Sequence, residues 1–298
     1  MRYQVRHETE YRYSQPVTLG HSSLHLRPRP VDRQRCIDMQ IDIAPRPAVM
    51  TERTDYFGNP VNYFIVQQPH QVMTIATHCT IDVDRVEPLI DGVSQPWEAV
   101  RDGLRHDTSP AGLDAYQHTF DSALAPGPGT TATPEFAGYA TESFPAGRPI
   151  LDGARDLTQR ISDDFTFDPT TTNVATPVKQ VFDQRSGVCQ DFAHLMIALL
   201  RALGLPARYV SGYLRTYPPP GQPRLRGADA SHAWVGVYCP GFGWADFDPT
   251  NNKLVASDHI TVAWGRDYAD VAPVKGLVLG GDEHYLSVRV DVAPDSAE

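Results

Sequence analysis

One cysteine stands at the point where a helix is expected to begin. From Cys189 to Leu203 apolar residues recur every three or four positions, and the run stops before Gly204 and Pro206, which predicts a core helix with Cys189 at its N-terminus. The first amide N–H groups of a helix have no partner within it, and their partial positive charge stabilises a thiolate. The sequence therefore predicts a reactive thiol at Cys189, against the alternative of a small buried residue that only begins the helix.

A histidine and two carboxylates follow this cysteine on a predicted β-hairpin. His232 lies in one alternating segment and Asp246 and Asp248 in the next, with the turn 240–243 between them. Pro240 is midway between His232 and Asp248, so we expect these two residues to face each other directly across the strands. Asp246 is the second choice, because a shift of two residues in register keeps the face and changes the partner.

The order cysteine, histidine, aspartate matches nucleophile, base and orienting carboxylate in papain-like thiol enzymes. In such a site the Cys189 thiolate attacks a carbonyl group, the His232 imidazolium protonates the leaving amine, and Asp248 orients the imidazole. The backbone N–H of Cys189 is the expected first donor to the oxyanion, with Gln184 or Asn173 as candidates for the second. The alternative is a buried histidine that is only satisfied by a nearby carboxylate.

A metal site is a weaker interpretation of the same region. Its ligands would be Cys189, His194 and His232. Cys189 and His194 are five positions apart, which places them off one face of a helix, and no fourth residue has the spacing of a zinc ligand. We therefore expect a thiol site with no metal and no other cofactor.

The elements that must position these residues predict an α+β chain in two parts. Alternation with a period of two at 3–13, 37–43 and 73–83 predicts an N-terminal antiparallel β-sandwich-like domain over residues 1–106. Residues 107–134 are rich in Gly and Pro and are expected to connect it to the catalytic core. The core, residues 135–298, is expected to place helices before antiparallel strands and to include the final strands of the chain.

Composition excludes several classes of protein. The 298 residues carry 26 Lys and Arg against 36 Asp and Glu, a net charge of −10, which argues against a nucleic-acid partner. The four cysteines contain no CxxC pair, so neither a disulfide scaffold nor a structural zinc site is expected. No apolar run approaches the ~18 residues of a membrane helix, and the first residues lack a signal pattern. We expect a cytoplasmic protein with no membrane partner.

Several segments around these residues resemble the bacterial transglutaminase-like family, whose members include proteins described as cysteine proteases. The resemblance implies a papain-like core and assigns the triad to Cys189, His232 and Asp248. It also implies a β-rich N-terminal region. Animal transglutaminases are calcium-dependent, but this sequence contains no DxDxDG-like loop that would suggest a calcium site. The matching segments are Asp55–Asn59, Arg185–His194, Leu203–Tyr213, Ser231–Trp234, Phe247–Thr250 and Gly265–Pro273.

The expected activity is thiol-dependent acyl transfer or hydrolysis at a carboxamide or peptide bond, through a thioester, on a protein or peptide substrate. Transfer to an amine and hydrolysis share the first half of the reaction. A peptide-binding module that keeps the cleft without turnover is the alternative from a different class. The proline-rich loop 218–223 is expected to form one rim of the cleft.

Overall fold

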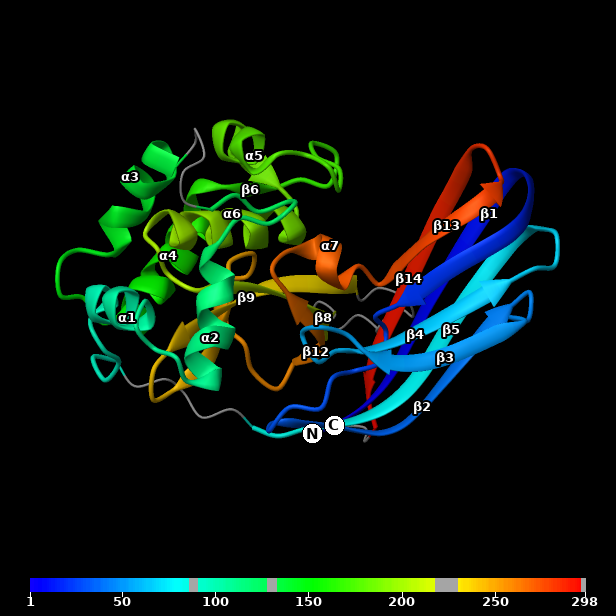
Figure 1. The fold of residues 1–298 in the computed structure, drawn as a ribbon, viewed down its shortest axis with the longest axis horizontal. Helices are drawn as coiled ribbons and strands as arrows, with labels where there is room; N and C mark the ends of the chain where they lie inside the picture. Colours follow the sequence, from blue (N-terminus) through cyan, green and yellow to red (C-terminus); the bar gives the residue numbers. More distant parts are fainter. Residues whose placement is uncertain (86–90, 128–132, 218–229, 296–298) are drawn as a thin grey trace.

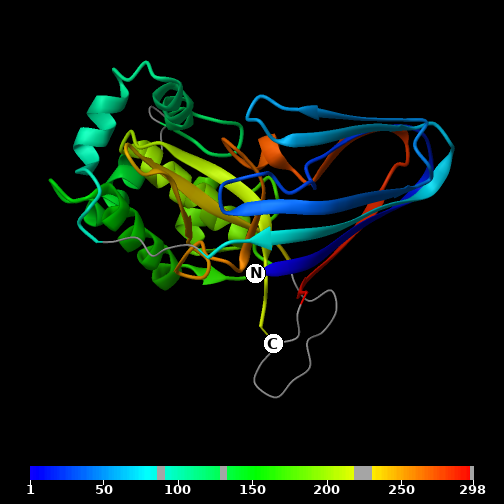
Figure 2. The same ribbon diagram turned by 90° about the horizontal axis from the view of Figure 1, so that it is seen from below.

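The computed structural model describes residues 1–85, 91–127, 133–217 and 230–295. Figure 1 shows two parts side by side: a part in which helices cover a small sheet, and an elongated part made of long strands. The turned view in Figure 2 shows the same division, with the long strands extending away from the helices. The β-rich N-terminal region and the α+β core predicted from the sequence are both present.

The elongated part is a curled antiparallel sheet built around one long strand. This strand is β1 (Arg2–Leu24), and its first half, up to Arg12, pairs with β5 (His70–Val83). Its last residues, Gly20–Leu24, pair with β4 (Pro60–Val66). β1 therefore lies in the middle of the sheet, between β5 and β4, and the strand order is β2-β5-β1-β4-β3. The strands are β1 (Arg2–Leu24), β2 (Gln34–Ala44), β3 (Val49–Thr54), β4 (Pro60–Val66) and β5 (His70–Val83).

The C-terminal strands belong to this sheet and not to the α+β core. β13 (Val274–Gly280) and β14 (His284–Pro294) both pair antiparallel with β1, so the expectation that they complete the core was wrong. Alternation along a segment predicts a strand, but it does not name the strand's partner. The chain leaves the sheet after β5 and returns to it after the core.

The segment expected to be a loop between the two parts contains helices. α1 (Trp97–Leu104) precedes it, and α2 (Pro110–Tyr116) and the 3-10 turn η1 (Gln117–Thr119) lie within it. Ser109 caps α2 by accepting the N–H of Gly112, and Pro110 occupies the first turn. Serine followed by proline is a common start for a helix, so the signal was present among the turn-forming residues.

The core packs its helices on a five-stranded antiparallel sheet of order β11-β10-β9-β8-β12. The central helix α6 (Cys189–Ala202) contacts β8 and β9 and is buried from Asp191 to Arg201. The other helices are α3 (Thr133–Ser143), α4 (Ile150–Asp164), α5 (Val178–Gln184) and α7 (Tyr268–Val271). The strands are β8 (Ala207–Leu214), β9 (Ala230–Cys239), β10 (Gly243–Asp248), β11 (Lys253–Leu254) and β12 (His259–Gly265), with a short parallel pair β6 (Thr166–Phe167) and β7 (Ser186–Gly187).

The turn Asp55–Asn59 fastens the N-terminal sheet to β12 of the core. The Asn59 side chain accepts the backbone N–H of Trp264 at 3.0 Å and donates to the Trp264 carbonyl at 2.8 Å. The Arg29 guanidinium donates to Asn59 and lies 3.5 Å from the centre of the Trp264 ring. These contacts fix the last core strand against the N-terminal region.

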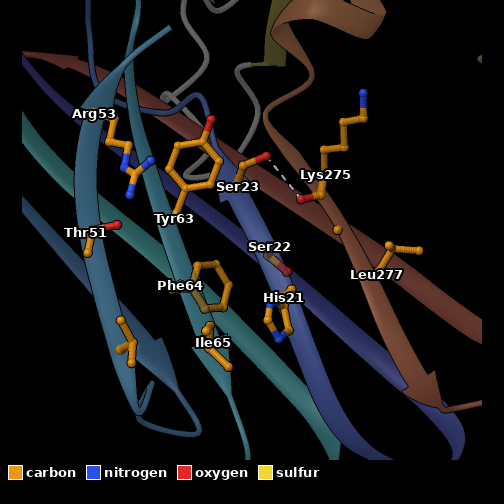
Figure 3. A pocket seen from close by; sticks show the side chains of 12 residues that line it. His21, Ser22, Ser23, Thr51, Arg53, Tyr63, Phe64, Ile65, Lys275 and Leu277 are labelled. Carbon is orange, nitrogen blue, oxygen red and sulfur yellow. Dashed lines mark hydrogen bonds between the residues drawn. The ribbon is translucent and has the colours of Figure 1, made fainter.

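One face of the N-terminal sheet is exposed across β3, β4, β1 and β13. Figure 3 shows its side chains in cross-strand rows above a depression of about 520 Å³. One row joins Val49, Ile65, His21 and Leu277, and the next joins Thr51, Tyr63, Ser23 and Lys275.

Within the described ranges, every helix is too short or too polar to cross a bilayer.

Candidate active site

Cys189 is the first residue of α6, as predicted. The residue before it, Val188, has an extended backbone and donates its N–H to Asp191 Oδ2 at 2.8 Å. Thr172 donates to the same oxygen at 2.6 Å, which ties the preceding loop to the first turn of the helix. A Cβ on Gly187 would lie 2.8 Å from Asp191, so the approach to the helix requires glycine. The thiol is left partly exposed.

His232 and Asp248 are in contact, although the predicted register was wrong. Asp246 pairs with Gly236 and Phe247 with Val235, so the hairpin is centred on residue 241, one position after Pro240. His232 is therefore not directly opposite Asp248 and reaches it diagonally. The Nε2 atom of His232 lies 2.8 Å from Asp248 Oδ2. The two side chains still meet because a shift of two residues in the strand register leaves both on the same face of the sheet.

The protonation of His232 reflects its two neighbours. Burial disfavours the charged imidazolium, but hydrogen bonds and charge from Asp248 and Cys189 outweigh it and raise the pKa of His232 to about 10. Nε2 is committed to Asp248, so Nδ1 is the ring nitrogen left for the thiol. The arrangement favours an imidazolium at neutral pH, the form that can deliver a proton to a leaving group.

Asp248 is fully buried and receives five hydrogen bonds. Its Oδ1 accepts the backbone N–H groups of Thr250 and Asn251 at 3.0 and 3.2 Å. Its Oδ2 accepts the Asn251 amide at 2.8 Å and the Nε2 atoms of His232 at 2.8 Å and His259 at 3.2 Å. Burial raises the pKa of a carboxyl group, but here these donors lower the pKa of Asp248 well below its usual range. The carboxylate is held ionised and in one orientation.

His259 and Asn251 were not among the residues predicted from the sequence. Asn251 follows Asp248 in a turn, and an aspartate that accepts the amides after it is a recognisable local pattern. His259 begins β12 and is 2% exposed. Its Nδ1 accepts the N–H of Ala256 at 3.4 Å, which leaves the proton on Nε2, the atom that faces Asp248.

The second-choice carboxylate, Asp246, lies in a different environment. Its Oδ2 accepts the indole N–H of Trp234 at 3.3 Å. Burial lowers the pKa of Arg208 to about 10, and the negative charge of Asp246 acts in the opposite direction. The Arg208 guanidinium lies between the rings of Trp244 and Trp264, 4.3 and 3.8 Å from their centres. Asp246 therefore balances a buried cation and does not contact the His232 ring through a hydrogen bond.

The cysteine-containing metal set is not brought together in the described part of the chain. His194 accepts the backbone N–H of Tyr268 at 3.1 Å, and burial lowers its pKa to about 4. The group that does converge among the described residues is His232, Asp248 and His259, whose possible ligand atoms lie within 4.8 Å of one another. Two imidazoles and a carboxylate are a known metal-binding set. Here, however, the Ala256 N–H on Nδ1 keeps the His259 proton on Nε2, which the hydrogen bond to Asp248 uses.

The second oxyanion donor stays a prediction. Asn173 uses its side-chain oxygen to accept the N–H of Ala175 in its own loop, and Gln184 is exposed at the end of α5. Gln190, next to Cys189, donates to the Val174 carbonyl at 3.4 Å. The loop expected to form a rim, 218–223, lies outside the described residues.

Two family models match the chain. Residues 3–82 match the bacterial transglutaminase-like N-terminal region, and residues 139–249 match the transglutaminase-like superfamily. The second match spans Cys189, His232 and Asp248. An uncharacterized protein of Mycobacterium tuberculosis, Rv2569c, is 44% identical over 98% of this chain and 93% of its own length. An uncharacterized protein of Mycobacterium leprae, ML0607, is 31% identical over 98% of both chains.

Two further proteins are similar over all or part of the chain. A Pseudomonas aeruginosa protein-glutamine gamma-glutamyltransferase is 38% identical over 124 residues, which is 41% of this chain and 17% of that protein. A solved structure titled "The Crystal Structure of a Putative Cysteine Protease from Cytophaga hutchinsonii to 1.9A" aligns with a TM-score of 0.76. The alignment covers 100% of this chain and 92% of the other at 21% identity, so it shows the shared fold.

Proposed function

Because this chain belongs to the transglutaminase-like superfamily and carries the bacterial transglutaminase-like N-terminal region, we propose that it is a thiol-dependent acyltransferase or hydrolase. Its substrate is a protein or peptide that offers a side-chain carboxamide or a peptide bond. One observation carries the proposal: the His232 ring bonds to the buried Asp248 carboxylate at 2.8 Å, and the Cys189 thiol helps to raise the pKa of the same ring. Nucleophile, base and orienting group form one connected set.

In the resting site the Cys189 proton already lies on Nδ1 of His232, and in the first half-reaction the Cys189 thiolate forms a bond to the carbonyl carbon. The carbon–nitrogen bond then breaks, and the His232 imidazolium gives its proton to the departing amine or ammonia. The product is a thioester on Cys189. Asp248 stays ionised throughout and stabilises the imidazolium, since its donors disfavour protonation of the carboxylate.

In the second half-reaction a nucleophile attacks the thioester carbon while His232 takes its proton, and the carbon–sulfur bond breaks to return the Cys189 thiolate. A primary amine gives a new amide, and water gives a carboxylate. The Pseudomonas relative is named as a glutamine transferase, which makes a glutamine side chain the first substrate to test. Because a fold of this kind supports several reactions, the acceptor is decided by measurement.

Mass spectrometry of a glutamine-containing peptide incubated with the protein, with and without a primary amine, tests the proposal. A mass gain of the amine less ammonia identifies transfer, a gain of about one dalton identifies deamidation, and two shorter peptides identify proteolysis. Cys189→Ala should abolish all three, whereas Cys239→Ala, at a buried cysteine beside a turn, should retain them. Peptide binding without any product would instead support the peptide-binding module.

A further inference from the structure

Two imidazole rings donate to the same oxygen of the orienting carboxylate. His232 and His259 approach Asp248 Oδ2 through their Nε2 atoms, at 2.8 and 3.2 Å. Both rings are buried, and their centres are 6.3 Å apart. The triad is thereby extended to a fourth residue, which comes from a different strand.

Orientation of Asp248 does not require this fourth residue. Two backbone N–H groups hold Oδ1, and the Asn251 amide and His232 hold Oδ2. These four hydrogen bonds already prevent rotation of the carboxylate. The fifth hydrogen bond to the carboxylate, which is the third on Oδ2, has another consequence, because its donor draws on the negative charge that the His232 imidazolium also uses.

We propose that His259 is a positioning residue that moderates the basicity of His232 through their shared carboxylate oxygen. The proposal rests on the proposed function, because it assigns His232 the task of both accepting and releasing a proton. Without His259, Oδ2 would be shared by His232 and the Asn251 amide alone, and it would hold the imidazolium too strongly and slow proton delivery to the leaving amine. Sharing Oδ2 with the N–H of a second ring weakens that hold and keeps the imidazolium a competent acid.

Among the described residues, several charged groups act on the pair or lie beside it. Cys189 on α6 and Asp248 on β10 act on His232 directly. Arg33, ahead of β2, donates to the backbone oxygen of His259 at 3.0 Å. The carboxylate of Asp258, beside His259, accepts the hydroxyl groups of Tyr3 and Tyr217. The Asp246 charge acts on Arg33 and Arg208.

Two substitutions separate donation from packing. His259→Phe keeps a ring beside Trp234, which now meets the His259 ring edge to face at 5.3 Å, but it removes the donor. His259→Gln keeps an N–H donor. His7→Phe is the matched control, because His7 is equally buried but bonds to Tyr213 and Thr9, away from Asp248.

The rate of Cys189 alkylation by iodoacetamide, followed from pH 5 to 11, reports the ion pair and needs no turnover. In His259→Phe the alkaline limit of the thiolate–imidazolium form should move up by about half a pH unit or more, because His232 then has a larger share of the Oδ2 charge. His259→Gln and His7→Phe should keep the wild-type limit. An unchanged limit in His259→Phe, or one that moves down, overturns the proposal.

A spectroscopic measurement on the unmodified protein covers the case in which His259→Phe does not fold. In proton NMR of the wild type, the Nε2 proton of His259 should be shifted downfield by its bond to the carboxylate, and it should move when His232 titrates. A proton that does not respond to that titration contradicts the proposal. If both measurements succeed while no peptide product forms, the proposed function fails and the shared carboxylate stands.

Discussion

Asp246 and Asp248 lie two residues apart on the same face of β10, yet their surroundings assign them different tasks. Asp248 receives five hydrogen bonds and belongs to the His232 network. Asp246 faces Arg208, and neither its Oδ1 nor the Arg208 Nε has a hydrogen-bond partner. A carboxylate rich in donors orients a base, whereas one that balances a stacked cation stabilises the fold. Substitution of Asp248 should therefore lower the rate of the reaction, whereas substitution of Asp246 should change the stability of the fold.

Asp248→Asn should have the largest effect. An asparagine at this position offers the His232 ring an amide in place of a charge, which disfavours the imidazolium and the required tautomer. We expect the rate of product formation to fall by roughly 10³- to 10⁴-fold. Asp246→Asn is the control, and its activity per folded molecule should stay within about tenfold of wild type. Equal losses in the two variants would show that the carboxylates share one role.

Arg208→Met should have the largest effect on stability. It removes the cation that lies over the rings of Trp244 and Trp264, and with it the positive charge that the half-buried Asp246 carboxylate faces. Two desolvated cation–π contacts at about 2 kcal/mol each set the expected loss at about 2–4 kcal/mol in the free energy of unfolding. Urea denaturation measures this loss. If the double variant with Asp246→Asn is no more stable than Arg208→Met alone, the two charges are not coupled.

Gly236→Ala tests the space between these two groups. A Cβ at Gly236 would lie 2.8 Å from Arg208 Nε and 2.9 Å from Asp246 Oδ1, so one of them must move. We expect a loss of about 1–3 kcal/mol in the free energy of unfolding. Gly103→Ala, on α1 with open space around it, should be neutral or slightly stabilising. A neutral Gly236→Ala would mean that the pair is less tightly placed than the distances indicate.

Acid should weaken the fold through histidines outside the site. Burial lowers the pKa values of His7 and His194 to about 4, so both are neutral in the folded protein and take protons on unfolding below about pH 6.5. Stability should therefore fall as the pH drops from about 6.5 towards 4, by about 1.4 kcal/mol per pH unit for each proton.

His232 works in the opposite direction. Its raised pKa adds stability that is fully present below about pH 6.5 and is lost as the pH rises towards 10. Urea denaturation at pH 4.5 and 6.5 measures the acid effect. The double variant of His7→Gln and His194→Gln should flatten the slope, and an unchanged slope would assign it to other groups.

Local patterns predicted the parts of the site that depend on neighbouring residues. The helix from Cys189 could be predicted because apolar spacing and the Gly204 stop are local, and Gly204 does end it with a positive φ. The face shared by His232 and Asp248 follows from the period of a strand. Their exact register does not, because a shift of two residues moves the centre of the hairpin by one position without changing the pattern.

Contacts between distant elements could not be predicted. β12 and β10 are separated by β9 and β8 in the sheet, so the bond from His259 to Asp248 depends on how the sheet curls and where the connection after β10 returns. The return of β13 and β14 to β1 is of the same kind. Both are decided by packing between elements far apart in the sequence, which no periodicity specifies.

The central claim is that Cys189 forms a thioester, and the most direct test is to trap it. The protein is mixed with a glutamine-containing peptide, quenched in acid within seconds, digested and mapped by mass spectrometry. We predict an adduct of the peptide less ammonia on Cys189 alone. Burial raises the pKa values of Cys36, Cys79 and Cys239, so they should stay unmodified. The adduct should be lost in Cys189→Ala and nearly lost in Asp248→Asn. An adduct on Cys239, or product formation by Cys189→Ala, would contradict the account.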